Sequence, residues 1–476
     1  MRYNDPYLPG VPERTASVFF FGSLAILAIN CVSQILAFPF QCVLIIYAVV
    51  KCDIKLFPGM FLLMLDKSDF PPLHAQVIKF NLGFSVSPTN VFLITVFFFS
   101  LISVARRVYD GRTLAWFLPW LTCIVPALAM ALPARSQGLA SVWQTPIIQF
   151  MTPAVYFWGI CVGRTWDHGK RFFVDKMVLV LAVLNILELF SVFHIFTFAE
   201  HVSMLALLAG CLILRSGLGT KVMALIGGLF AVANVLLGRY MNMLEDKGYA
   251  TSAEMGSTFT RVMVVVLGVM MIWLFWRKQV QRTIIRLIPY IAFVGCLCVF
   301  VYAVGRARSM NMSDAVENKY QTWLERFEFK LVGDRGPLWS TSLDYVFEKP
   351  LFFRDLMNQM VLTPNPQTGQ MELGMRVLPH NQVLTLLVRD GWWQGLVLVF
   401  FLWWSHIRTF NAASDMVDDK ALLCTLLAPY GAIFIAVGLT GQSVLFYIFC
   451  SNGMVTLAYP GIIYGALSWR KSGGNM

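Results

Sequence analysis

The sequence has little charge and lacks the common motifs of soluble catalytic sites. Charged residues make up 13% of the 476 residues, whereas hydrophobic residues make up 58%, which is far from the average soluble domain. The chain contains no Gly-x-x-x-x-Gly-Lys-[Ser/Thr] phosphate loop and no Asp-x-Asp motif. Histidine and cysteine are nowhere clustered at metal-ligand spacing. These absences argue against a nucleotide-hydrolysing enzyme of the phosphate-loop type and against a zinc site, so no metal is expected.

The cysteines do not form a pattern typical of a disulfide framework. There are ten of them, and all lie in or beside apolar segments. Cysteines in such places behave as small buried hydrophobic residues. They occupy positions 31, 42, 52, 123, 161, 211, 296, 298, 424 and 450.

Long apolar runs are what the chain does contain. Many approach the roughly 17–25 residues that cross a bilayer as a helix, and none alternates in polarity as barrel strands do. The sequence therefore predicts an all-α, polytopic helical membrane protein with about 12–14 transmembrane helices. The runs lie near 16–34, 36–50, 54–65, 89–105, 113–132, 146–163, 173–194, 198–214, 220–238, 262–276, 284–304, 383–407, 421–439 and 443–468.

The net charge of +11 comes from basic loops that alternate along the chain with loops of balanced charge. An excess of Lys and Arg is typical of the cytoplasmic loops of membrane proteins. The charge therefore indicates topology and no nucleic-acid partner. The prediction places both termini in the cytoplasm and one large loop, 305–380, on the outer side of the membrane. Three parts follow: a helix bundle over 1–304, the large outward-facing loop over 305–380, and further transmembrane helices over 381–476.

The large loop has predicted local structure of its own. Ser313–Lys330 has helical spacing, and Arg335–Phe347 is expected to form a second short helix, because Pro337 suits a first turn. Pro364–Gly374 is rich in turn-forming residues. Loops of this length without regular structure are usually functional.

Two residues of this loop are candidates for chemistry. Arg335 carries a guanidinium that matches phosphate oxygens bidentately, although an ion pair with Asp334 would also explain it. His380 lies where the loop returns to the membrane, between Pro379 and Asn381. Imidazole is suited to proton transfer near neutral pH, although a residue next to a helix cap is the plainer interpretation.

Two further arginines belong to the predicted outer face. Arg261 begins the apolar run 262–276, and Arg239 lies in the preceding outward loop. Taken singly, each is better explained as an anchor to lipid headgroups.

The order of these motifs resembles the O-antigen ligase and polysaccharide polymerase family. The resemblance rests on Arg335-Gly336-Pro337-Leu338-Trp339, Lys349-Pro350-Leu351, Pro379-His380-Asn381-Gln382-Val383-Leu384, Arg389-Asp390-Gly391 and Gly395. The resemblance in motifs is specific over roughly 335–395, and elsewhere only the general architecture is similar.

The resemblance implies a metal-independent glycosyltransferase without cofactors in the bacterial inner membrane. Such a protein takes glycan from an undecaprenyl-pyrophosphate-linked donor and passes it to a lipid A-core acceptor or to a second lipid-linked chain. His380, Arg335 and Arg261 are the expected catalytic residues, and Trp339, Asn381 and Arg239 the expected substrate-binding residues. The altered sequence after Lys349-Pro350-Leu351 favours a polymerase over a ligase.

A transporter or flippase for lipid-linked oligosaccharide is the main alternative. Transporters usually carry internal repeats and ionisable groups near the bilayer midplane. No repeat stands out, and Glu188 is the clear mid-span carboxylate. A scaffold protein is a third possibility.

Overall fold

The computed structural model of the chain describes most of the predicted apolar runs. The described residues are 10–64, 88–105, 111–136, 150–189, 217–245, 276–309, 336–348, 360–364, 371–375, 381–431 and 457–473, with isolated positions between them.

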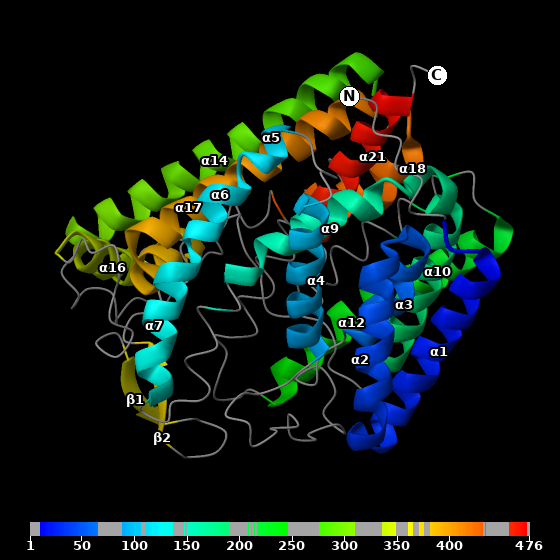
Figure 1. The fold of residues 1–476 in the computed structure, drawn as a ribbon, viewed down its shortest axis with the longest axis horizontal. Helices are drawn as coiled ribbons and strands as arrows, with labels where there is room; N and C mark the ends of the chain where they lie inside the picture. The colour runs from blue at the N-terminus through cyan, green and yellow to red at the C-terminus, as the bar shows by residue number, and fades with distance from the viewer. Residues whose placement is uncertain are drawn as a thin grey trace.

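Helices account for nearly all of the described regular structure (Figure 1). The sole exception among the described residues is an antiparallel hairpin of β1 and β2, in which Met360 pairs with Met375 and Pro364 with Met371. The all-helical prediction is confirmed except for this hairpin, whose strand β2 includes residues 371–374 of the segment Pro364–Gly374 that was predicted to be a turn. The elements are α1 (Glu13–Val32), α2 (Gln34–Lys51), η1 (Ile54–Leu56), α3 (Phe57–Leu63), α4 (Pro88–Ala105), α5 (Gly111–Leu114), α6 (Phe117–Thr122), α7 (Ile124–Ser136), α9 (Pro153–Gly163), α10 (Trp166–Leu189), α12 (Leu218–Glu245), α14 (Lys278–Ser309), α16 (Gly336–Glu348), β1 (Met360–Pro364), β2 (Met371–Met375), α17 (Gln382–Asp415), α18 (Lys420–Leu422), the π-helix η7 (Leu423–Leu427) and α21 (Tyr459–Gly473).

Two of the described helices are long and apolar enough to cross a membrane, judged by length and composition. They are Lys278–Ser309, which is α14, and Gly391–Asp415, the greater part of α17. Shorter apolar helices include Ile35–Lys51, Pro88–Val104 and Pro153–Gly163. The full count of 12–14 membrane spans stays a prediction.

Helices α9 and α21 pack backbone to backbone. A Cβ atom at Gly163 would lie 2.2 Å from the Ile462 carbonyl oxygen, and one at Gly465 would lie 2.1 Å from that of Ile160. Gly159-x-x-x-Gly163 therefore faces Gly461-x-x-x-Gly465, and the missing side chains allow the close approach. Paired small residues of this kind are typical of helices that associate in membranes.

An aromatic cluster packs beside these helices. Trp120 of α6 stacks on Phe157 of α9 at 5.6 Å between ring centroids, and Phe157 meets Phe401 of α17 at 5.5 Å. Rings at this spacing add to the stabilisation from burial alone.

Two apolar runs do not form the simple spans that their sequences predict. The run 54–65 forms η1 and α3, which are fully buried and too short to cross a bilayer. The run 383–407 belongs to α17, which is broken at Gly391, where φ is 76° and ψ is 178°. Only glycine adopts this region without strain.

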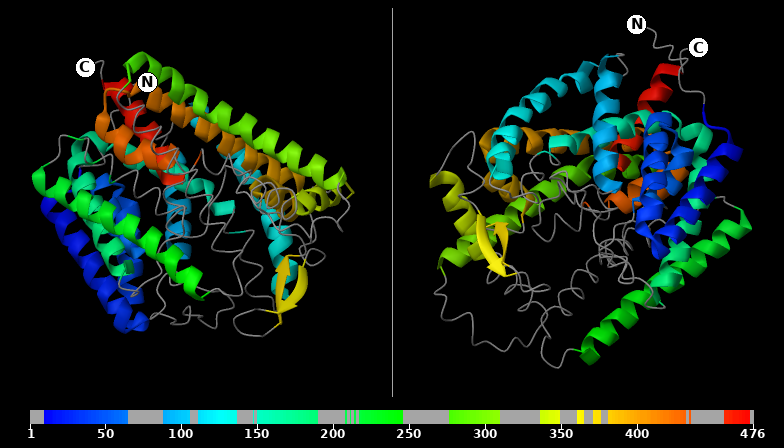
Figure 2. Two further views of the ribbon diagram at one scale, coloured as in Figure 1. Left: turned by 180° about the vertical axis from the view of Figure 1, so that it is seen from behind. Right: turned by 60° about the horizontal axis from the view of Figure 1, so that its bottom comes forward.

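The break folds α17 back on itself. A Cβ at Gly395 would lie 3.0 Å from the carbonyl oxygen of Leu386, whereas residues so far apart in an unbroken helix are separated by about 13 Å along the axis. We call residues 382–390 the short arm of α17 and residues 391–415 the long arm. The long arm runs beside α14 (Figures 1 and 2).

Candidate functional site

The first turn of α16 lies directly against the last turns of α14. A Cβ at Gly336 would lie 2.7 Å from both the Ala303 carbonyl oxygen and the Ala307 Cβ, so glycine is required for this approach. Pro337 lies in the first turn, as the sequence predicts. Arg308 of α14 then holds the exposed side of α16, since its Nε donates to Ser340 Oγ at 2.9 Å and its Nη2 pairs with Asp344.

Trp339 fixes the buried side of α16. Its side chain is fully buried, and its ring stacks on Phe300 of α14 at 5.3 Å between centroids. Ala303, Val304 and Leu384 complete a small cluster around it. We call this set of five residues the Trp339 cluster.

The start of α17 reaches the same cluster. Asn381 is the N-cap of α17, and its Oδ1 accepts hydrogen bonds from the backbone amides of Val383 at 3.1 Å and Leu384 at 3.3 Å. Leu384, in the first turn, packs against Trp339. The first turns of α16 and α17, far apart in sequence, therefore meet at one place.

The two helices continue in the same direction from this meeting point. Val346, near the end of α16, packs with Leu387 and Val388, near the end of the short arm. Two helix N-termini consequently lie near each other, and the N-terminal end of a helix carries partial positive charge.

The six predicted site residues differ in what the structure shows of them. Trp339 and Asn381 are described, and both are engaged in internal contacts, so their direct contact with substrate stays a prediction. The backbone of Arg239 belongs to α12. Arg335, His380 and Arg261 lie outside the described residues, although Arg335 immediately precedes Gly336 in the sequence and His380 immediately precedes Asn381.

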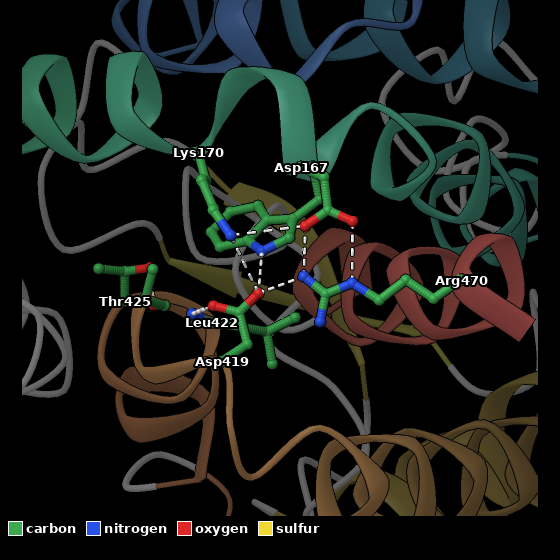
Figure 3. Close-up of polar contacts among 8 residues, drawn as sticks. Asp167, Lys170, Asp419, Leu422, Thr425 and Arg470 are labelled. Carbon is green, nitrogen blue, oxygen red and sulfur yellow. Dashed lines mark hydrogen bonds and ion pairs between the residues drawn. The ribbon is translucent and has the colours of Figure 1, made fainter. Parts of the chain in front are cut away.

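A network of ion pairs (Figure 3) lies at the end of the bundle where α14 begins, next to the pair that Lys278 of α14 forms with Asp418. Asp419, whose side chain is 4% exposed, accepts a hydrogen bond from Trp166 Nε1 at 3.1 Å and pairs with Arg470 at 2.5 Å and Lys170 at 3.5 Å. Its second oxygen accepts the Leu422 amide at 3.1 Å and thereby caps α18. The network joins the start of α10, the start of α18 and the end of α21.

Arg470 also binds Asp167 through two nitrogens, with the Nε contact at 2.8 Å. These hydrogen bonds lower the pKa of Asp167 and raise that of Arg470. Each partner stabilises the charged form of the other.

A chain of hydrogen bonds extends the network to the start of the protein. Asp53 accepts the Val11 amide at 2.6 Å, and the Ile54 amide donates to Thr165 Oγ1 at 2.9 Å, next to Trp166 in sequence. Lys278 pairs with Asp418 at the start of α14. The described ends of α1 and α21 therefore lie at the same end of the bundle as several of the basic loops.

A buried polar pair in the helix bundle is the feature that the sequence interpretation missed. His406 of α17 and Tyr430 are both about 1% exposed; they share a hydrogen bond between Nδ1 and the phenol oxygen. The His406 Nε2 is buried without a hydrogen-bond partner in the part of the chain that the structure describes. The π-helix η7 shortly precedes Tyr430, and such distortions are frequent at functional sites. In the sequence, the signal that could have indicated this pair was a histidine inside an apolar run.

Comparisons with known proteins identify no relative of this chain. No protein-family model, no curated protein and no solved structure matches it.

Proposed function

We propose that the chain is a multi-pass protein of the bacterial inner membrane. The support comes from α14, whose most apolar 18-residue window is only 22% buried. Large side chains such as Ile291, Val294 and Val301 are exposed along it. Monomeric soluble proteins rarely expose so continuous an apolar surface. The facing glycine motifs of α9 and α21 are a second support.

The proposed orientation places the ion-pair end in the cytoplasm and α16 in the periplasm. Its support is that basic loops gather at the first end, while α14, at 32 residues, is about 48 Å long and exceeds the roughly 30 Å of the hydrocarbon core.

Single cysteines test this orientation. Ser309, at the end of α14, and His168, in the first turn of α10, are both exposed positions. In intact cells, Ser309→Cys is expected to gain labelling by an impermeant thiol reagent over the parent protein, and His168→Cys only after permeabilisation. The reverse pattern would overturn the orientation.

We further propose that the protein is a glycosyltransferase of the polymerase or ligase type. The observation that carries this proposal is the meeting of α16 and α17 at the Trp339 cluster. The two motifs with candidate chemistry, Asp334-Arg335-Gly336 and Pro379-His380-Asn381, each lead into one of these helices. The resemblance to the O-antigen ligase and polymerase family supplies the reaction.

In the proposed reaction, a hydroxyl oxygen of the acceptor glycan attacks the anomeric carbon of the donor glycan. The bond from that carbon to the undecaprenyl pyrophosphate breaks, and the pyrophosphate leaves with the electron pair. Arg335 and Arg261 balance the charge that develops on it. His380 accepts the proton of the attacking hydroxyl.

Product formation with purified protein and a lipid-linked oligosaccharide tests this proposal. Arg335→Ala is expected to lower the rate about 10²–10³-fold, and Arg335→Lys nearly as much, because lysine loses the bidentate fork. Arg282→Ala, an exposed change at the ion-pair end, is the control and leaves the rate unchanged. Wild-type rates in both Arg335 variants would refute the assignment.

Removal of divalent ions is a second test. Because the proposed charge balance comes from arginines, transfer is expected to persist in excess EDTA. Loss of product that a divalent ion restores would contradict the arginine-based account.

A lipid-linked oligosaccharide transporter is the second candidate, and the His406–Tyr430 pair favours it. Ionisable residues inside membrane helices often mark transport pathways. Purified protein that moves such lipids across liposomes but joins no sugars would establish this alternative.

A further inference from the structure

The break in α17 holds a polar side chain that the fold does not use. Gln394 is fully buried, and neither its amide oxygen nor its amide nitrogen has a hydrogen-bond partner among the described residues. The indole nitrogen of Trp392 is likewise buried without a partner. Buried polar groups are nearly always paired, so unpaired ones call for an explanation.

The position of Gln394 makes the absence of partners more notable. Gly391 is non-helical, so it caps the long arm, and Gln394 is the third residue after it. Glutamine at this position commonly reaches back to the cap amide. Here it does not, and the amide faces the protein interior instead.

The residues next to Gln394 contact two other helical segments. Gly395, the next residue, lies against Leu386 of the short arm. The Trp392 ring lies 6.2 Å from that of Phe347 of α16. Gln394 therefore belongs to the first turn of the long arm, whose neighbouring residues contact the short arm and the helix whose first turn follows Arg335 in the sequence. We call this first turn, together with the short-arm and α16 surfaces that it contacts, the neck.

We propose that this neck is a binding site for hydroxyl groups of the glycan, with the Gln394 carboxamide as its polar contact. A carboxamide both donates and accepts, which suits a sugar hydroxyl that does the same. Because the amide is sealed from solvent, glycan enters when the arms separate about Gly391. The inference rests on the proposed transferase function and assigns a glycan subsite to it.

The test compares Gln394→Met with Gln41→Met in purified protein. Gln41 is also a buried glutamine, but its amide nitrogen donates to the Leu63 carbonyl. Removing the unpaired amide is expected to raise the Tm by about 1–3 °C without ligand. Removing the paired amide of Gln41 is expected to lower the Tm.

Binding is then measured with two probes, bare undecaprenyl pyrophosphate and the same lipid carrying an oligosaccharide. Gln394→Met is expected to bind the oligosaccharide lipid about 10-fold more weakly than wild type and the bare lipid equally well. Equal binding of the oligosaccharide lipid by variant and wild type would overturn the subsite while leaving the transferase proposal intact. Equal loss of both lipids would also overturn it, because the effect would then not concern the glycan. Wild-type protein that binds neither lipid would overturn the transferase proposal itself.

Discussion

Gly336→Ala tests whether the close packing of α16 on α14 positions Arg335, the residue that directly precedes α16. The added Cβ would lie 2.7 Å from Ala303 and Ala307, whereas ordinary contacts begin at about 3.4 Å. The first turn of α16 must therefore retreat by roughly 0.7 Å. Overpacking of this kind costs about 1–3 kcal/mol, which a folded protein tolerates. A misplacement near 1 Å at a reacting group costs about 100-fold in rate.

We therefore expect Gly336→Ala to insert and fold, and to lose about 10–100-fold in transfer rate. Gly305→Ala is the matched control, since Gly305 lies on the exposed side of α14 with nothing within 4 Å of its Cβ position. Alanine there improves helix propensity by about 1 kcal/mol, and the rate is unchanged. The assay is product formation per folded protein, measured beside the Tm. A folded Gly336→Ala variant that transfers glycan at the wild-type rate would refute the positioning argument.

Two further predictions concern the fold. Gly163→Val is expected to prevent α9 and α21 from packing, because a Cβ there lies 2.2 Å from the Ile462 carbonyl oxygen; an unaltered Tm would contradict this. The pKa of Asp167 is lowered by Arg470, so the stability that this pair contributes is present above the ordinary carboxylate pKa and is lost as the pH falls through the lowered value. The free energy of unfolding of wild type is therefore expected to fall as the pH is lowered through this range, and that of Asp167→Asn is expected to depend less on pH there. Identical pH profiles of the two proteins would contradict the assignment.

Apolar run length correctly predicted where most described helices lie, because a helix that faces apolar surroundings must be continuously apolar. The helix α16 was predicted from Pro337 in its first turn, since local backbone chemistry decides helix starts. The break at Gly391 was not predicted, because the apolar run 383–407 is long enough for one span. Arg389-Asp390-Gly391, a polar interruption that ends in a turn-forming Asp-Gly pair, was the local signal.

Long-range contacts were beyond the sequence alone. The close packing of α16 on α14 depends on Ala303 and Ala307, which are distant in sequence from Gly336. The pairing of His406 with Tyr430 likewise joins two separate runs. The facing glycine motifs of α9 and α21 were visible as patterns, but the pattern does not name its partner. The β1–β2 hairpin was missed because strands of five residues carry a weak periodic signal.

The most direct test of the central claim is donor retention measured beside transfer in His380→Ala. The account separates the two roles: arginines hold the pyrophosphate, and His380 acts on the acceptor hydroxyl. His380→Ala is therefore expected to retain labelled lipid-linked oligosaccharide with wild-type affinity while its transfer rate falls about 10²–10⁴-fold. A folded His380→Ala protein that transfers glycan at the wild-type rate would contradict the account.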